Sequence, residues 1–205
     1  KERKDRDSVI VNNGVDTALF RPDPTARQAA RAKLGLSPDA RVAIIVARVD
    51  PQKDWATVLR GLRLVDGLVT LAVGPTTAKL EPQPGLMLIG AHMTMQDLYP
   101  AADVFILPSA FGEGTSVAMC EAMSCGLPVI VTDVGDNAVY AKDAGFVIPS
   151  GDPHALADTL QRLFSSGAER ERMSAHARQI AQATFGPAAS FRALFECWDS
   201  IAAKQ

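Results

Sequence analysis

Six short apolar runs that alternate with helix candidates constrain the fold of this 205-residue chain more than any other feature. Each run has the length of a strand that is buried on both faces of a sheet. Strands that alternate with helices are typical of βαβ units and a parallel sheet. We therefore expect an α/β fold, a doubly wound parallel sheet with helices on both faces. The expected strands are residues 42–46, 68–73, 86–89, 104–107, 128–131 and 146–148.

The expected helices carry their own start signals. Asp54 can cap one helix, and Asp152 followed by Pro153 combines an N-cap residue with the proline favoured at the first helical position. No repeat or low-complexity linker interrupts the alternation, so we expect a single domain over residues 1–205, with residues 186–205 as its C-terminal helix. The expected helices are residues 25–34, 54–64, 95–101, 116–125, 153–164, 169–183 and 187–202.

Composition argues against several classes of protein. The formal charge is −2 and only 6% of the residues are aromatic, so the chain lacks the basic patch and the stacking surface of a nucleic-acid-binding protein. Cys120, Cys125 and Cys197 are odd in number, and two of them fall within an apolar helix candidate. We expect free thiols in a reducing cytoplasm, no metal site and no nucleic-acid partner.

The start of the chain, residues 1–7, is a charged run with no apolar segment behind it. No stretch approaches the roughly eighteen apolar residues of a membrane span, so we expect neither a signal peptide nor a transmembrane helix. A strand-like run at residues 9–11 follows almost at once. This abrupt entry is typical of the middle of a larger protein, and the chain is expected to be a fragment.

Two cations follow the first apolar run. In open α/β sheets the ligand binds outside the carboxyl ends of the strands, where Arg48 and Lys53 are expected. A lone arginine and lysine are most often surface charges. Arginine can also bind two phosphate oxygens at once while lysine acts as a point charge, so this pair suits a diphosphate.

A second loop supplies a helix N-terminus at the same edge of the expected sheet. The run 104–107 is followed by a turn with Gly112 and Gly114, and by a helix that begins near Thr115 or Ser116. Unpaired backbone N–H groups and the helix dipole make such an N-terminus a phosphate site. The cations and this N-terminus are predicted to converge on one volume that fits a pyrophosphate.

Two glutamates flank that volume. Glu121 lies within the apolar helix 116–125, where a carboxylate must be paired, neutralised or kept for a ligand. It is about five residues into the helix, a rise of roughly 8 Å, which suits a ribose beside the phosphates. Glu113, on the other side, would face the group beyond the second phosphate. The pattern indicates a nucleoside at one end of the ligand and a sugar at the other.

These motifs, in this order and spacing, resemble a known family. The chain resembles the nucleotide-binding C-terminal half of retaining glycosyltransferases of the GT-B fold, specifically glycosyltransferase family 4 (group 1). In this family the C-terminal half is a Rossmann-like domain. The resemblance covers nearly the whole chain, and the segment from Glu113 to Glu121 is its strongest part. The matching segments are residues 13–16, 46–53, 98–109, 113–130, 132–135 and 151–153.

The resemblance implies a role for each candidate residue. Arg48 and Lys53 would hold the diphosphate of the donor during catalysis, and Glu113 would contact the donor sugar. Glu121 would bind the ribose hydroxyls. The implied donor is a nucleotide diphosphate sugar, a UDP-sugar before a GDP- or ADP-sugar, bound without a metal. The backbone of Gly114, Thr115 and Ser116 would face the distal phosphate, and the loop with His92 and Met93 would face the base.

The resemblance also implies the reaction and its partner. The family transfers a sugar, here a hexose, to an acceptor hydroxyl with retention of configuration, and we expect a role in bacterial polysaccharide or glycolipid synthesis. The acceptor site belongs to an N-terminal GT-B domain that precedes residues 13–16, so this fragment is expected to be inactive alone. Most of the apolar stripe on the last helix, which includes Phe191, Leu194, Phe195, Trp198 and Ile201, is expected to be local core. The rest of it would pack against that domain. A cytoplasmic location, peripheral at the inner membrane face through the missing domain, is expected.

Two residues depart from the family pattern. Ala47 replaces the glycine usual before the arginine, and Thr115 replaces the aromatic residue usual after Glu113-Gly114. The second change alters the wall of the implied sugar pocket. Asp103, which opens a strand, is expected to be structural.

Two other functions remain to be weighed. A nucleotide-binding regulatory or scaffold module of the same fold, without transferase activity, would be favoured by the loss of Arg48, Lys53 or Glu121, and all three are present. An NAD-linked dehydrogenase would need a Gly-x-Gly-x-x-Gly fingerprint after the first strand, and that fingerprint is absent from the sequence.

Overall fold

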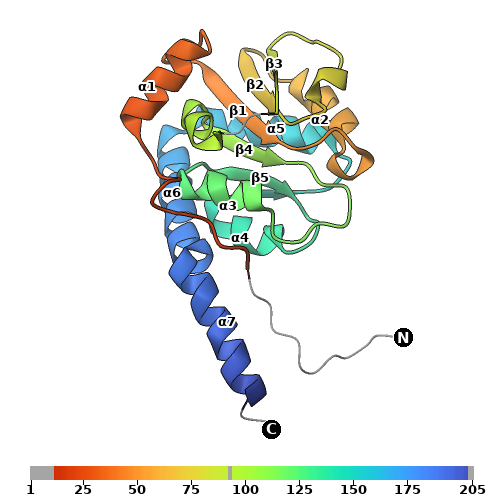
Figure 1. Cartoon of the computed structure of the whole chain (residues 1–205). Helices are drawn as coiled ribbons and strands as arrows, with labels where there is room; N and C mark the ends of the chain where they lie inside the picture. The colour runs from red at the N-terminus through yellow and green to blue at the C-terminus, as the bar shows by residue number, and fades with distance from the viewer. Residues whose placement is uncertain (1–11, 92–93, 203–205) are drawn as a thin grey trace, which may run out of the picture.

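The computed structural model describes residues 12–91 and 94–202, so the predicted strand 9–11 lies outside the described residues. Six parallel strands form one sheet in the order β3-β2-β1-β4-β5-β6, which confirms the predicted doubly wound, Rossmann-like α/β fold (Figure 1). The observed strands differ from the predicted ones by no more than one residue at each end. They are β1 Arg41–Val46, β2 Leu68–Val73, β3 Leu86–Gly90, β4 Val104–Leu107, β5 Val129–Thr132 and β6 Gly145–Ile148.

The strand order reverses at the centre of the sheet. The chain runs outward from β1 through β2 to β3, then returns to place β4 on the other side of β1. Ala43 of β1 is in register with Val104 of β4, so the carboxyl ends of these two strands are neighbours. Such a reversal is the topological switch point at which open α/β sheets bind ligands.

Helices cover both faces of the sheet because successive strand residues point to opposite sides. Val42 and Ile44 of β1 belong to the core under α3, α4 and α6, whereas Ala43 and Ile45 belong to the core under α2 and α5. Strands that are buried on both faces explain why the sequence shows them as unbroken apolar runs. The helices are α1 Pro24–Lys33, α2 Trp55–Leu62, α3 Val117–Ser124, α4 Asn137–Ala144, α5 Pro153–Ser165, α6 Gly167–Ile180 and α7 Pro187–Ala202.

Three segments differ from the expected helices. The predicted helix 95–101 is two 3₁₀ turns, Met95–Asp97 and Tyr99–Ala101, because Pro100 lacks an N–H and its ring opposes a continuous α-helix. Helix α4 was not predicted, since its buried contacts come mainly from Ala141 and Ala144, too small to produce a clear apolar pattern. The predicted helix 169–183 starts at Gly167 and continues after Ile180 as a π-helical turn, Ala181–Phe185.

Helix α7 extends away from the sheet (Figure 1). The prediction that most of its apolar stripe is local core is wrong: Phe191, Phe195 and Trp198 are 55–60% exposed, whereas Leu194 is half-buried. An edge-to-face contact between Phe195 and Trp198 is the aromatic pairing on this stripe. The apolar face of α7 is therefore available to another part of the protein.

A cluster of buried charges lies at the amino end of β4. Arg31, from α1, is 3% exposed and donates to both carboxylate oxygens of Asp103 and to backbone carbonyls around it. Arg27 also pairs with Asp103, whose Oδ2 accepts the backbone N–H of Val42 at 2.8 Å. The predicted structural role of Asp103 is confirmed, since it joins α1, β1 and β4.

Candidate functional site

The loop after β1 and the loop after β4 meet at the switch point. The side chain of Gln52 donates to the carbonyl of Gly112 at 2.7 Å, and its backbone carbonyl accepts the N–H of Ala110 at 2.7 Å. The indole of Trp55, at the start of α2, donates to the carbonyl of Arg48 at 2.9 Å, which anchors the first loop to that helix. Two loops about 60 residues apart in sequence thus form one surface.

The predicted residues Lys53 and Glu113 are in direct contact. The ammonium of Lys53 forms an ion pair with Glu113 Oε2 and lies 3.3 Å from the hydroxyl of Ser109, which donates to the same carboxylate oxygen. Both charged side chains are mostly buried, 12% and 11% exposed. A charge pair that is held this far from water is costly unless each charge compensates the other or a ligand.

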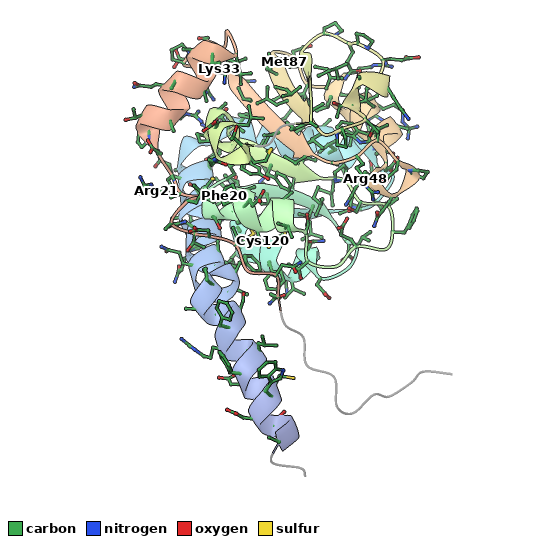
Figure 2. All side chains as sticks on the ribbon, viewed as in Figure 1. Phe20, Arg21, Lys33, Arg48, Met87 and Cys120 are labelled. Carbon is green, nitrogen blue, oxygen red and sulfur yellow. The ribbon has the colours of Figure 1, made fainter. Side chains whose placement is uncertain are left out.

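Arg48 lies on the same side of the sheet but points to solvent. Its side chain is 66% exposed and pairs with Asp50 Oδ2 at 3.2 Å. Figure 2 shows Arg48 at the right of the molecule, where the loops after β1 and β4 also lie. Among the described residues, the second oxygen of Asp50 is buried without a hydrogen-bond partner. Because the Arg48 side chain is long and exposed, the other N–H groups of its guanidinium can turn toward a ligand.

The N-terminus of α3 is capped, yet it keeps open donors. Ser116 is the N-cap, and its N–H donates to Asn137 Oδ1 at 2.9 Å, so the amide of Ser116 is not free for a phosphate as predicted. Asn137 also donates to the carbonyl of Gly114 at 2.8 Å. Within the described ranges, the amides of Gly114, Thr115, Val117 and Ala118 have no hydrogen-bond acceptor. Those amides, rather than that of Ser116, are the free backbone donors of the loop.

Thr115 is held by the segment that enters the domain. Its hydroxyl donates to Asn12 Oδ1 at 3.2 Å, and the hydroxyl of Tyr140 donates to the same oxygen at 3.1 Å. The side chain of Asn13 lies 3.4 Å from the carbonyl of Thr115. A residue that replaces an aromatic side chain of the family pattern is thus part of a polar contact between residues 12–13, α3 and α4.

Gly135 explains why the loop before α3 can lie so close to the loop after β5. Its φ is +67°, and a Cβ atom there would lie 1.8 Å from the carbonyl oxygen of Glu113. Any side chain at this position would collide with the backbone of the site. Ser109, Gly135 and Asn137 were not predicted as site residues. Gly135 lies in one of the motifs, and Asn137 follows a strand, so strand-end position was the available signal.

Glu121 lies one turn into α3 with one oxygen in use. The hydroxyl of Tyr99 donates to its Oε2 at 2.8 Å. Burial raises the pKa of Glu121 above its ordinary value, and the Tyr99 hydrogen bond lowers it in part. The prediction that a carboxylate here must be paired or kept for a ligand is consistent with this arrangement.

The remaining predicted residues are placed as follows. His92 and Met93, predicted to face the base, lie outside the described residues. In the part of the chain that the structure describes, no group of three metal-ligating side chains comes together. No helix in the same part is long and apolar enough to cross a membrane.

A family model decides the classification. The model described as glycosyl transferases group 1 matches residues 26–180, most of the chain. This chain belongs to that family. A relative in the group, the D-inositol 3-phosphate glycosyltransferase of Mycolicibacterium gilvum (strain PYR-GCK), is 32% identical over 175 residues, which cover 77% of this chain and 39% of that protein. The chain thus spans about two fifths of the length of this relative.

Solved structures share the fold of this group 1 chain. HepE of Anabaena, in complex with UDP and glucose, superposes with a TM-score of 0.83 at 20% identity, covering 93% of this chain and 56% of that one. The C-terminal domain of the glycosyl transferase group 1 family protein LpcC from Francisella tularensis superposes with a TM-score of 0.71 at 20% identity. That superposition covers 85% of this chain and all of the other. At these identities the likeness shows the fold alone.

Proposed function

We propose that this chain is the C-terminal donor-binding domain of a retaining glycosyltransferase of family 4, which transfers a sugar from a nucleotide diphosphate sugar to an acceptor hydroxyl. The observation that carries the proposal is the contact of Lys53 with Glu113 at the switch point, beside open amides of α3. A cation, a carboxylate and free N–H groups in one place suit a diphosphate joined to a hydroxyl-rich group.

The donor would lie along the N-terminus of α3. Its diphosphate would meet Lys53, Arg48 and the amides of Val117 and Ala118, while Glu113 would accept from sugar hydroxyls. Glu121, one turn further, would accept from the ribose, and the loop with His92 and Met93 would face the base. A UDP-sugar is the first candidate because HepE, a structural relative, holds UDP and glucose. GDP- and ADP-sugars are the next candidates.

The chemistry of this half is stabilisation of a leaving group. As the glycosidic bond breaks, negative charge grows on the departing diphosphate, and Arg48, Lys53 and the α3 dipole would hold that charge in a fixed position. Glu113 would orient the sugar by accepting its hydroxyls. No side chain in this scheme needs a metal ion, and the acceptor hydroxyl would attack from the face that the diphosphate leaves.

The acceptor would bind to an N-terminal GT-B domain of the same parent protein. The α7 stripe around Trp198 is exposed, as expected if a second domain packs against it. Residues 1–205 would then form one domain that binds donor but is inactive as an isolated fragment. The parent enzyme would be a cytoplasmic hexosyltransferase of bacterial polysaccharide or glycolipid synthesis, peripheral at the inner membrane face.

The test is nucleotide binding by the domain itself. At about a hundredfold excess over Kd, a true ligand adds about 2.7 kcal/mol of stability, a shift of about 5 to 11 °C in thermal midpoint for a domain of this size. We expect such a shift with UDP, GDP or ADP, equal with and without magnesium. Lys53→Ala should weaken diphosphates far more than nucleosides, whereas Glu121→Ala should weaken both. Equal affinity of both variants for every ligand would exclude the site.

A regulatory or scaffold module of the same fold, with the same nucleotide site and no transferase activity, is the second candidate. The two functions differ once the parent protein is assayed. A transferase loses sugar transfer when Lys53 is replaced, and it hydrolyses or transfers the donor when intact. A module binds the nucleotide with the same residues but shows no turnover in the full-length protein.

A further inference from the structure

The phenol of Tyr99 is a buried polar group that contacts Glu121 at the candidate ribose site. The side chain is fully buried between β4 and α3. Its hydroxyl lies 2.8 Å from Glu121 Oε2 and 3.2 Å from the carbonyl of Ala118. A phenol has one proton to donate, and the shorter contact to a carboxylate is the stronger hydrogen bond.

The aromatic ring of Tyr99 is held in a fixed place. Phe20 and Phe105 pack against it edge-to-face, with ring centroids 6.0 and 6.4 Å away. Arg178 donates to the carbonyl of Phe20 at 2.9 Å, which fixes that neighbour in turn. Figure 2 shows Phe20 beside α3. The hydroxyl therefore approaches Glu121 from a rigid wall of the core.

Within the described structure, one of the two carboxylate oxygens of Glu121 has a hydrogen-bond partner. Oε2 accepts from Tyr99, whereas Oε1 has no partner among the described side chains and amides. We propose that Tyr99 is a positioning residue that fixes the Glu121 carboxylate, so that its second oxygen meets the ribose hydroxyls of the donor. This inference rests on the proposed function, because it assigns Glu121 to the ribose.

The other titratable groups around Glu121 do not replace Tyr99. Burial raises the pKa of Cys120 and of Cys125 to about 12, so both neighbouring thiols are neutral. Arg178, from α6, directs its donors at the carbonyls of Thr17, Phe20 and Ser124. The strands beneath α3 present apolar side chains to it. Tyr99 is thus the donor that favours the ionised form of Glu121 within the described structure.

The experiment compares UDP with 2′,3′-dideoxy-UDP, which lacks the ribose hydroxyls. We expect the wild-type domain to prefer UDP, and Tyr99→Phe to weaken UDP about tenfold while leaving the dideoxy compound unchanged, the scale of one hydrogen bond to a charged group. The chain has two tyrosines, and Tyr140→Phe is the comparison: its hydroxyl contacts Asn12 and not Glu121, so any loss of affinity there should be equal for UDP and the dideoxy compound. A wild-type preference in Tyr99→Phe would overturn the inference.

Failure of the proposed function gives a different result. If wild type does not prefer UDP, or if Glu121→Ala keeps that preference, the ribose assignment itself is wrong. If both behave as expected, a double variant isolates Tyr99. Tyr99→Phe combined with Glu121→Ala should bind UDP no more weakly than Glu121→Ala alone, because Tyr99 acts through Glu121. Additive losses would show that Tyr99 acts on the fold instead.

The pH dependence of the preference for UDP tests whether Tyr99 positions the Glu121 carboxylate or only packs in the core. The donated hydrogen bond lowers the pKa of Glu121, so in Tyr99→Phe the preference for UDP should disappear at a higher pH as the solution is acidified. Should that variant fail to fold, 3-fluorotyrosine in a Tyr140→Phe background makes Tyr99 a stronger donor at nearly the same volume. The preference should then persist to lower pH, and an unchanged midpoint would overturn the inference.

Discussion

The two ends of the β1–β4 strand pair each carry a cluster of opposite charges, and the clusters differ in how far the protein satisfies them. At the amino end, Arg31 and Asp103 are saturated with hydrogen bonds to each other and to the backbone. At the carboxyl end, Lys53 and Glu113 contact each other beside amides that have no acceptor among the described residues.

We propose that this difference distinguishes a structural charge cluster from the candidate binding site. A buried charge whose donors and acceptors are all used joins elements of the fold, and it has nothing left to offer a ligand. For a cluster with unused donors at the switch point of the sheet, we expect the remaining partners to come from a ligand. Residue type alone does not separate the two, since both clusters pair a cation with a carboxylate.

The sharpest way to test this difference is to remove Arg31. Arg31→Ala should lower the free energy of unfolding by about 3 to 5 kcal/mol, because Asp103 keeps a buried charge without its main partner. Urea unfolding followed by tryptophan fluorescence measures the loss. Arg27→Ala is the matched control and should cost less, since its side chain is more exposed and the Arg31 pair remains. A loss below about 1 kcal/mol for Arg31→Ala would contradict the structural reading.

At the carboxyl end, backbone geometry should matter more than charge for stability. Gly135→Ala should cost about 1 to 3 kcal/mol and abolish the thermal shift with UDP, because the new Cβ would displace Glu113. Gly151→Ala is the control: it has a similar φ of +76° but no neighbour within 4 Å. Differential scanning fluorimetry with and without UDP compares them. Equal costs in both variants would mean that the close approach of the loops is not what holds the site.

Glu121→Gln should change the stability of the domain less than the two variants above, and it should raise the stability. The pKa of Glu121 is raised by burial, so the folded state holds its proton more tightly and the ionised carboxylate destabilises the fold at neutral pH. The variant should therefore melt higher than wild type at pH 7, and the gap should close as the pH falls toward the ordinary value of 4.5. UDP binding should weaken in the same variant. A lower melting point at pH 7 would show that the carboxylate stabilises the fold.

The smallest effect is expected on α7. Trp198→Ser should change the free energy of unfolding by no more than about 0.5 kcal/mol, because the indole is exposed. Urea unfolding followed by circular dichroism measures it without relying on the lost tryptophan. A loss above about 1 kcal/mol would mean that the stripe packs on this domain in solution and is not a docking surface.

Local sequence signals predicted most residues of the candidate site but not the contacts among them. The strand ends predicted Arg48, Lys53 and Glu113 as neighbours of one ligand, and the structure joins the last two in an ion pair. Arg48 instead points outward to Asp50. The Ser116 amide, predicted for a phosphate, is taken by Asn137, a residue of a helix that was not predicted at all.

The sequence by itself determined the order of strands and helices and the edge at which the charged residues gather. It could do so because apolar runs and capping residues act over a few neighbours, and because the ends of parallel strands share an edge. Only the tertiary structure decided which charged groups form all their hydrogen bonds within the protein and which lie beside unused donors. Lys53 with Glu113, Tyr99 with Glu121 and Arg31 with Asp103 are pairs between segments 22 to 72 residues apart, and no local pattern specifies which donor reaches which acceptor.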